Sequence, residues 1–257
     1  MKNKSFKVKR LSKSYPENDF ITEKFDTLTL DELKKVRIVF STPRSGSTYL
    51  CSKIHEHCGI IGHEYFQASG YIQYLARRWD CYDQSMIMKE DYWKKLVKYR
   101  SSNQTLVINL HGSHLSLFEK FIGNIKSLDV SCLHLIRANV LEQSVSYAVA
   151  RKTGQWTKYY DHISEEDLVI KNEELIKTAR AINGQNLKIN AFICKHQLNS
   201  KSMLYEHLIK EGSSLEAIND LGLKFNKSTS APIESLNLTK QNSSNKDLLI
   251  KQFCDFI

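Results

Sequence analysis

Three features of the sequence predict an α/β fold with a central, mainly parallel sheet. Short apolar runs alternate with helical patterns along the chain, instead of strands gathering in one part and helices in another. Each apolar run is bounded by polar or turn residues, which is typical of strands that are buried on both faces. The first run passes through a tight loop containing Gly46 directly into a helical pattern.

The elements follow from these patterns in order. Four strands are expected, the last with the weakest pattern, at residues 36–40, 106–110, 132–136 and 202–205. Helical periodicity predicts helices at residues 47–58, 85–100, 115–122, 139–152, 164–182 and 188–199. The polar residues 229–247 predict a long surface loop before a short terminal helix.

Composition bounds the class of protein. The 257 residues are 41% hydrophobic and 25% charged, as in one soluble globular domain. We expect this domain over residues 36–257, after a basic N-terminal extension of residues 1–35 that is partly ordered at most. No apolar run is long enough to span a membrane and the N-terminus lacks the apolar core of a secretory signal, so we expect a cytoplasmic protein without an integral membrane segment.

The cysteines, the histidines and the net charge indicate which kinds of site and partner to expect. The six cysteines show no CxxC spacing, which favours reduced thiols over a disulfide framework. The nine histidines form no HExxH motif, so we expect no metal site. The 37 Lys and Arg exceed the 28 Asp and Glu by nine, which favours an anionic partner such as a phosphate-rich cofactor or nucleic acid.

The most informative segment joins the first strand to the first helix. Unpaired N–H groups and the positive end of the helix dipole meet at such a junction and stabilise a phosphate or sulfate. Serine stands where the Walker pattern has its first glycine and its lysine, at Ser41 and Ser47, so ATP with magnesium is not the expected ligand. The residues expected to bind the anion are Pro43, Arg44, Ser45, Gly46, Ser47 and Thr48.

A second basic position follows the strand at 132–136. Arg137 stands at the carboxyl end of that strand, and Asn139 with Glu142 makes a capping-box-like start for a helix that begins at Val140. Ligands bind at this edge of open α/β sheets, so Arg137 and Ser146 are candidates for a second anion site. Ser144 is the alternative to Ser146.

Both segments resemble one family. STPRSGSTYL (41–50) is similar to the 5′-phosphosulfate loop of sulfotransferases that use 3′-phosphoadenosine 5′-phosphosulfate (PAPS), and the arginine form resembles the trehalose 2-sulfotransferase or lipopolysaccharide sulfotransferase branch. HLIRANVLEQSVSYAVARKTGQW (134–156) resembles the family's 3′-phosphate segment. The resemblance implies a P-loop NTPase-like three-layer fold, PAPS as sulfuryl donor and a hydroxyl of a carbohydrate or glycolipid as acceptor. It also implies that Arg44 stabilises the leaving group, and that Arg137 and Ser146 hold the 3′-phosphate.

The same resemblance suggests the base. Sulfuryl transfer needs a group that takes the proton of the acceptor hydroxyl, but it needs no metal where loop amides and an arginine stabilise the leaving phosphate. His63-Glu64-Tyr65-Phe66 is similar to the family's E-[YF]-F element, so Glu64 is the expected base. His63 is the competitor, because histidine is the residue type whose intrinsic pKa lies near neutrality. Lys240 resembles a basic residue in a C-terminal loop that closes over the nucleotide.

Two other functions stay open on sequence alone. A nucleotide-dependent phosphotransferase would keep the fold, although the missing Walker lysine argues against it. A basic nucleic-acid-binding domain would use the positive charge, although the family resemblance implies no nucleic-acid partner. A homodimer is the default expectation for the oligomeric state.

Overall fold

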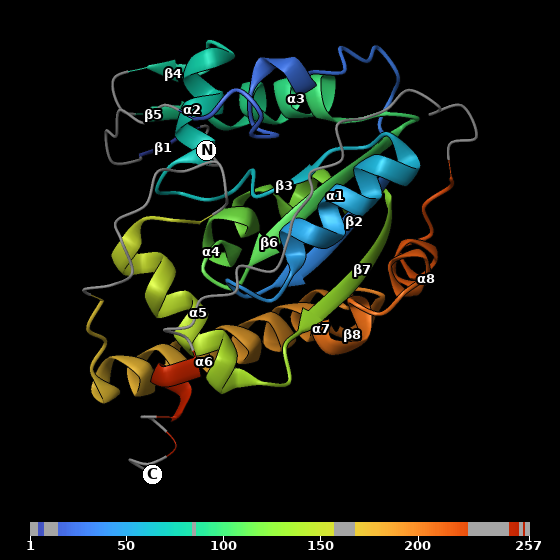
Figure 1. Ribbon diagram of the computed structural model, residues 1–257. Helices are drawn as coiled ribbons and strands as arrows, with labels where there is room; N and C mark the ends of the chain where they lie inside the picture. Colours follow the sequence, from blue (N-terminus) through green and yellow to red (C-terminus); the bar gives the residue numbers. More distant parts are fainter. Residues whose placement is uncertain are drawn as a thin grey trace.

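A computed structural model describes the following parts of the chain: residues 5–7, 15–83, 86–156, 168–225, 247–251 and 254. The central sheet has five strands, and every pair of neighbours in it runs parallel (Figure 1). Their order across the sheet is β3 (Gly62–His63), β6 (Thr105–His111), β2 (Lys35–Ser41), β7 (Asp129–Ile136) and β8 (Ser200–Leu204). The predicted α/β class with a central parallel sheet is therefore confirmed.

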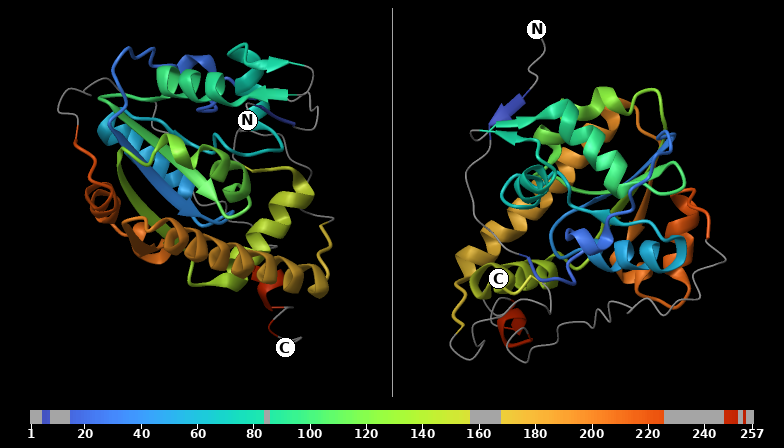
Figure 2. Two further views of the ribbon diagram at one scale, coloured as in Figure 1. Left: turned by 180° about the vertical axis from the view of Figure 1, so that it is seen from behind. Right: turned by 90° about the horizontal axis from the view of Figure 1, so that it is seen from above.

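Helices cover both faces of this sheet (Figures 1 and 2). Alternate residues of β2 point to opposite faces, so Val39 packs in one apolar cluster while Ile38 and Phe40 pack in another. Each such side chain contributes roughly 1.5–3 kcal/mol when fully buried. The Val39 face is covered by α1 (Ser47–Cys58), α7 (Tyr205–Leu208) and α8 (Ser213–Asp220). The other face is covered by α4 (Leu115–Phe118) and α6 (Asn172–His196), among others.

A smaller layer lies beyond the second face. Its antiparallel sheet has the order β1 (Ser5–Lys7), β5 (Met86–Met88) and β4 (Tyr82–Asp83). The helices of this layer are α2 (Tyr71–Arg78), α3 (Lys89–Arg100) and the short 3₁₀ turn η1 (Glu23–Phe25). A second 3₁₀ turn, η2 (Glu119–Asn124), continues α4, and α5 (Val140–Thr153) packs against α6.

Residues 15–26 are tied to this layer by one buried arginine. The Arg100 side chain is fully buried, and its guanidinium donates to the backbone carbonyls of Phe20, Ile21, Thr22 and Phe25. Asp26 lies 3.1 Å from it and supplies the opposite charge. The division of the chain at residue 35 stays a prediction, but these contacts bring the described part of the extension against the domain.

The predicted elements differ from the structure in several places. The two helices expected at 164–182 and 188–199 are one helix, α6, which begins at Asn172 and runs through Gly184. The segment expected to be helical from residue 85 begins as strand β5 and becomes helical at Lys89. Strand β3 of the central sheet, helix α2 and the small sheet were not predicted, because their short segments carry no long periodic pattern. Most of the loop expected at 229–247 lies outside the described residues.

Two further expectations concern membranes and thiols. None of the helices described is both long and apolar enough to cross a bilayer. All six cysteines are free; Cys194 and Cys254 are exposed, and the other four are buried.

Candidate active site

The carboxyl ends of all five parallel strands meet at one edge of the central sheet, where open α/β sheets bind ligands. The chain continues from these strands into Glu64 after β3, His111 at the end of β6, residues 42–46 after β2, Arg137 after β7 and Tyr205 after β8. The strand order leaves Glu64 and His111 on one side of the loop after β2, and Arg137 and Tyr205 on its other side.

The loop of residues 42–46 leads into the N-terminus of α1 as predicted. Gly46 has φ +88°, a left-handed conformation, and a Cβ built there would lie 2.5 Å from a ring carbon of Tyr205. Glycine is therefore required by both the backbone and the packing. Ser45 is fully buried and its Oγ has no hydrogen-bond partner among the described residues, although buried hydroxyls usually have one. This unused donor lies beside the helix N-terminus, where an anion is stabilised.

Arg44 connects the two predicted anion sites. Its backbone is left-handed, with φ +65°. Its Nε donates to Ser146 Oγ at 2.9 Å, and its Nη1 donates to the carbonyl of Trp156 at 2.8 Å. Burial lowers the pKa of Arg44, and repulsion from Arg137 lowers it further. Two positive charges, one partly buried and one buried, therefore lie close together in this part of the site.

Arg137 approaches the same loop from β7. Its Nη1 donates to the Arg44 carbonyl at 3.2 Å, and its guanidinium carbon lies 4.6 Å from the centre of the Tyr205 ring. Glu142 is its ion-pair partner, at 2.7 Å from Nη2. The buried Nε of Arg137 has no hydrogen-bond partner among the described residues. Arg137 and Ser45 thus each retain a buried donor that a ligand would satisfy.

The N-terminus of α5 is closed by the protein itself. Asn139 caps the helix as predicted, and its side-chain oxygen accepts from the backbone N–H of Glu142 at 2.9 Å. The Glu206 carboxylate accepts from the N–H groups of Ala138 and Asn139, each at 3.1 Å. The N–H groups at the start of α5 are therefore already bonded, and an anion at this edge of the sheet would bind at the N-terminus of α1.

Two buried amides that sequence reasoning did not select hold the loop in place. Gln143 donates to Thr42 Oγ1 at 2.8 Å and to the Pro43 carbonyl at 2.7 Å. Asn109 bridges β2 and α1, because it accepts from Ser41 Oγ at 3.0 Å and donates to Ser47 Oγ at 3.1 Å. Asn109 stands at the end of β6, where a buried polar residue in an apolar strand is the signal that marks such a bridge.

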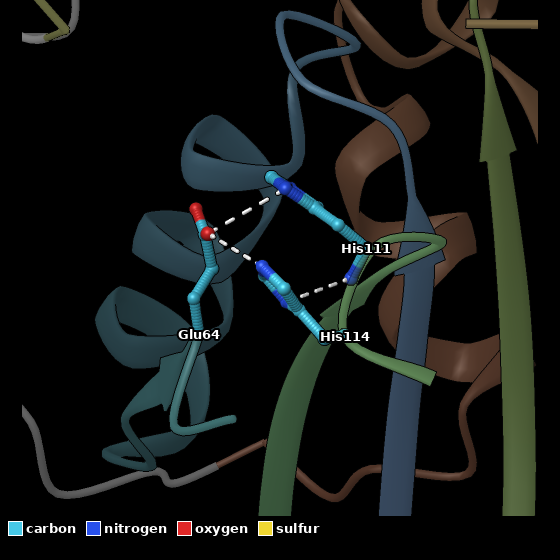
Figure 3. A group of neighbouring side chains, drawn as sticks. All are labelled: Glu64, His111 and His114. Carbon is cyan, nitrogen blue, oxygen red and sulfur yellow. Dashed lines mark hydrogen bonds and ion pairs between the residues drawn. The ribbon is translucent and has the colours of Figure 1, made fainter. Parts of the chain in front are cut away.

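Glu64 lies in a cluster with two histidines that were not predicted to join it (Figure 3). His111 Nδ1 is 3.5 Å and His114 Nε2 is 3.7 Å from the same carboxylate oxygen, Oε2. Gln67 donates to that oxygen at 3.4 Å. His114 Nδ1 accepts from the backbone N–H of His111 at 3.2 Å. Glu64 is the most exposed of the three cluster members, with 18% of its side chain accessible.

Glu64, His111 and His114 are also the residues that could hold a metal ion, since their ligand atoms lie within 4.8 Å of one another. The orientation of the two rings does not fit a shared ion. The two imidazoles are stacked at 18°, and nearly parallel rings cannot both direct an in-plane lone pair at one ion. The bond to His114 Nδ1 keeps the proton of the neutral ring on Nε2, where a metal would need a lone pair.

Burial shapes the titration of both rings. Desolvation lowers the pKa of His114 well below its usual value. It also lowers the pKa of His111, and the nearby Glu64 partly offsets this by raising it. Both rings are therefore neutral near pH 7, and each presents one N–H to its surroundings.

The remaining predicted residues make other contacts or lie outside the described chain. His63 Nε2 is 3.2 Å from Asp19, with which it forms a separate pair. The hydroxyl of Ser144 donates to the Val140 carbonyl within its own helix, whereas Ser146 contacts Arg44. Thr48 is exposed on the first turn of α1. Lys240 lies outside the described residues.

Comparison with known proteins gives one family. The model of the Stf0 sulphotransferase family matches residues 36–248. No curated protein matches the chain in sequence. A solved sulfotransferase from Alicyclobacillus acidocaldarius is 12% identical and has a TM-score of 0.51, over 88% of this chain and 93% of that one; at this identity the likeness concerns the fold.

Two further solved structures are more distant in shape. The sulfotransferase domain from the curacin biosynthetic pathway is 15% identical over 77% of each chain, with a TM-score of 0.46. The sulfotransferase domain from the Synechococcus PCC 7002 olefin synthase is 13% identical over 89% of this chain and 98% of that chain, with a TM-score of 0.45.

Proposed function

Because this chain belongs to the Stf0 sulphotransferase family, we propose that it transfers the sulfuryl group of PAPS to a hydroxyl group of a carbohydrate or glycolipid. The observation that carries the proposal is the meeting of two guanidinium groups, that of the partly buried Arg44 and that of the buried Arg137, beside the N-terminus of α1. Like charges repel, so this arrangement favours an anion that lies against both of them.

The residues present fit a nucleotide with phosphate at both ends. The loop amides, the Ser45 hydroxyl and the close backbone at Gly46 suit the 5′-phosphosulfate. Arg137 suits the 3′-phosphate together with Ser146. Within the described residues, neither Ser45 Oγ nor Arg137 Nε has a hydrogen-bond partner. Pro43, Ser47 and Thr48 complete the predicted loop, and Lys240 is proposed as a further cofactor contact from the C-terminal loop.

The contacts of Arg44 allow it to stabilise the leaving group. Its Nε donates to Ser146 Oγ, and the O–H of Ser146 can still donate to the 3′-phosphate. A guanidinium that leaves this bond when the nucleotide binds can turn toward the bridging oxygen of the leaving phosphate and neutralise the charge that develops there. We therefore assign Arg44 to leaving-group stabilisation.

Glu64 is proposed as the general base. PAPS, when bound, supplies a sulfuryl group whose bond to the 5′-phosphate oxygen breaks as the acceptor oxygen forms its bond to sulfur. The acceptor hydroxyl loses its proton in that step, and the Glu64 carboxylate accepts it. Among the cluster residues Glu64 is the most exposed, so it is the member that an acceptor can reach. No metal is needed for these roles, since fixed N–H donors and arginines stabilise the charges.

The surroundings of Glu64 favour a polyhydroxylated acceptor. The Asp19–His63 pair lies next to it along the chain, and the Tyr71 ring contacts His63 with 4.4 Å between the ring centres. Carboxylate and imidazole groups bind hydroxyls, and an aromatic face packs against the apolar side of a sugar ring. Both features support a carbohydrate or the sugar of a glycolipid.

The experiment is a transfer assay with ³⁵S-labelled PAPS and a panel of mono- and disaccharides and glycolipids. We expect labelled product with the wild type, no loss on adding EDTA, and loss in Arg137→Ala. Arg180→Ala, an exposed arginine on α6, is the matched control and should behave as wild type. Transfer that requires magnesium, or phosphate transfer from ATP in place of sulfuryl transfer, would contradict the proposal and favour a phosphotransferase.

A further inference from the structure

We propose that His111 and His114 are positioning residues that hold Glu64 by Oε2 and leave Oε1 as its proton-accepting atom. This inference rests on the proposed function, because it assigns the atom at which the base works. Neither histidine has been given a role by the family match or by the motifs of the sequence.

Among the described residues, the hydrogen bonds and ion pairs of the Glu64 carboxylate are all made by one oxygen. Oε2 faces His111 Nδ1 at 3.5 Å, His114 Nε2 at 3.7 Å and Gln67 Nε2 at 3.4 Å. Figure 3 shows both dashed lines from the imidazoles ending on the same oxygen. Within the described part of the chain, Oε1 takes part in no hydrogen bond or ion pair. The carboxylate is thus contacted through Oε2, and Oε1 remains for a hydroxyl group.

The hydrogen bond to His114 Nδ1 fixes the position of the proton on that ring. The backbone N–H of His111 donates to His114 Nδ1, so the neutral His114 ring carries its proton on Nε2, the atom that faces Glu64. Burial lowers the pKa of both rings, which keeps them neutral. At 3.5 and 3.7 Å the ring nitrogens lie beyond the roughly 2.7–3.2 Å of ordinary N–H···O hydrogen bonds, so each ring acts on the Glu64 carboxylate as an oriented N–H dipole.

The exposed fractions of the three side chains distinguish the base from the two histidines. Only 9% of the His111 side chain and 6% of the His114 side chain are accessible, against 18% for Glu64. His111 Nε2 is shut in and has no hydrogen-bond partner among the described residues. An acceptor hydroxyl therefore reaches Glu64 before it reaches either ring, and the histidines act through Glu64.

The turn that carries both histidines is packed against α6. A Cβ at Gly112 would lie 2.7 Å from the backbone oxygen of Gln185 in that helix. The Ser113 N–H also donates to Gln185 Oε1 at 3.2 Å. These contacts fix the turn against α6 and so keep both rings beside Glu64.

The test is ¹⁵N NMR of the imidazole groups at pH 7.5 in the full-length protein. We expect His114 to be the Nε2–H tautomer and His111 the Nδ1–H tautomer. Glu64→Leu removes the shared acceptor and should shift the donor nitrogens of both rings. Glu56→Leu, which removes a carboxylate of α1 that pairs with Lys53, should leave both rings unchanged.

Kinetic rescue distinguishes positioning from folding. With the acceptor found in the transfer assay, His114→Phe should lower kcat about tenfold or more with little change in the KM for PAPS, and His114→Gln should restore part of kcat because its amide donates again. An Nδ1–H tautomer at His114 would overturn the inference. Ring ¹⁵N shifts that do not change in Glu64→Leu would overturn it as well. If His114→Phe does not fold, the NMR signature of Glu64→Leu decides alone.

These outcomes are separate from those of the proposed function. The NMR signature needs neither donor nor acceptor, so its loss overturns only the anchoring of Glu64. Absence of sulfuryl transfer in the assay above would overturn the proposed function even with the rings in the expected tautomers. Zn²⁺ added alone gives a further contrast: displacement of both ring protons by the ion would mean that the cluster is a metal site and would overturn the inference.

Discussion

Arg44 and Arg137 stand 93 positions apart in the chain and meet over one loop. Their side chains come from the ends of neighbouring parallel strands, so the register of β2 with β7 brings them together. The two positive charges repel each other, and a bound anion attracts both of them. The pair of arginines therefore favours the state with an anion bound. The residues of the loop act on the same anion through N–H and hydroxyl groups.

Glu64→Gln tests the base directly. The amide keeps the size of the side chain but cannot accept the proton, so we expect kcat to fall by a factor on the order of 10² to 10⁴. Binding of 3′-phosphoadenosine 5′-phosphate should stay within about twofold of wild type, as measured by isothermal titration. Glu56→Gln is the control and should keep its activity. Unchanged turnover in Glu64→Gln would remove Glu64 from the mechanism.

Gly46→Ala tests the packing of the anion loop. Left-handed backbone costs an L-residue roughly 1–2 kcal/mol, and the new methyl group would also overlap the Tyr205 ring. We expect a lower free energy of unfolding in urea and at least tenfold weaker binding of the bisphosphate. Wild-type affinity in this variant would mean that the loop does not need its close backbone.

The site could be predicted in part from local patterns. A strand, a loop with Arg44 and Gly46, and a helix N-terminus form one continuous stretch, so the anion site was visible in the sequence. His111 and His114 were visible only as two histidines three apart, because their relation to Glu64 depends on the pairing of β3 with β6. The contact of Tyr205 with Gly46 likewise joins residues that are distant in the chain.

At the scale of elements, α6 shows why local patterns can mislead. Gly184 weakens helix propensity in the middle of a 25-residue helix, so the sequence suggested two helices with a break between them. Packing of Ile189 and Phe192 in the core and of Leu175 against α5 keeps the helix continuous. The strands β2, β6 and β7 were easier to predict, because fully buried strands are nearly continuous apolar runs.

Gly184→Ala tests this explanation. Nothing lies within 4 Å of a Cβ at this position, so the substitution adds helix propensity without a clash. We expect the free energy of unfolding in urea to rise by about 0.5–1 kcal/mol. Gly112→Ala is the contrasting variant, because its methyl group would meet Gln185; it should destabilise the protein. A loss of stability in Gly184→Ala would mean that the helix needs flexibility at its centre.

At the scale of the whole molecule, buried histidines couple folding to pH. Burial lowers the pKa values of His55, His111, His114 and His134 below the ordinary value of 6.5. The unfolded chain therefore binds more protons than the folded one once the pH falls below about 6.5, and stability is lost in that direction.

Urea denaturation between pH 7.5 and 5.5 measures this coupling. We expect the free energy of unfolding to fall as the pH decreases, by up to about 1.4 kcal/mol per pH unit for each ring that stays neutral in the fold. His114→Gln should show a smaller fall, because one of the four groups is gone. A stability that is flat or rises over this interval would contradict the account of buried, neutral histidines.

The fold as a whole separates two tasks along one sheet edge. The β3 and β6 side carries Glu64 with its histidines, and the β7 and β8 side carries Arg137 and Tyr205, with the loop after β2 between them. This order predicts that the nucleotide spans the loop and the Arg137 side, which leaves the Glu64 side for the acceptor. A nucleotide with one phosphate group would contact either the loop after β2 or Arg137, but not both.

Isothermal titration with 3′-phosphoadenosine 5′-phosphate, 5′-AMP and ATP with magnesium tests whether the site binds a nucleotide with phosphate at both ends. We expect the bisphosphate to bind at least tenfold more tightly than 5′-AMP without magnesium, and Arg137→Ala to lose about 1.5–3 kcal/mol of binding free energy for the bisphosphate but little for 5′-AMP. Equal affinities for the two nucleotides in the wild type, or tighter binding of ATP with magnesium, would rule out this mode of binding.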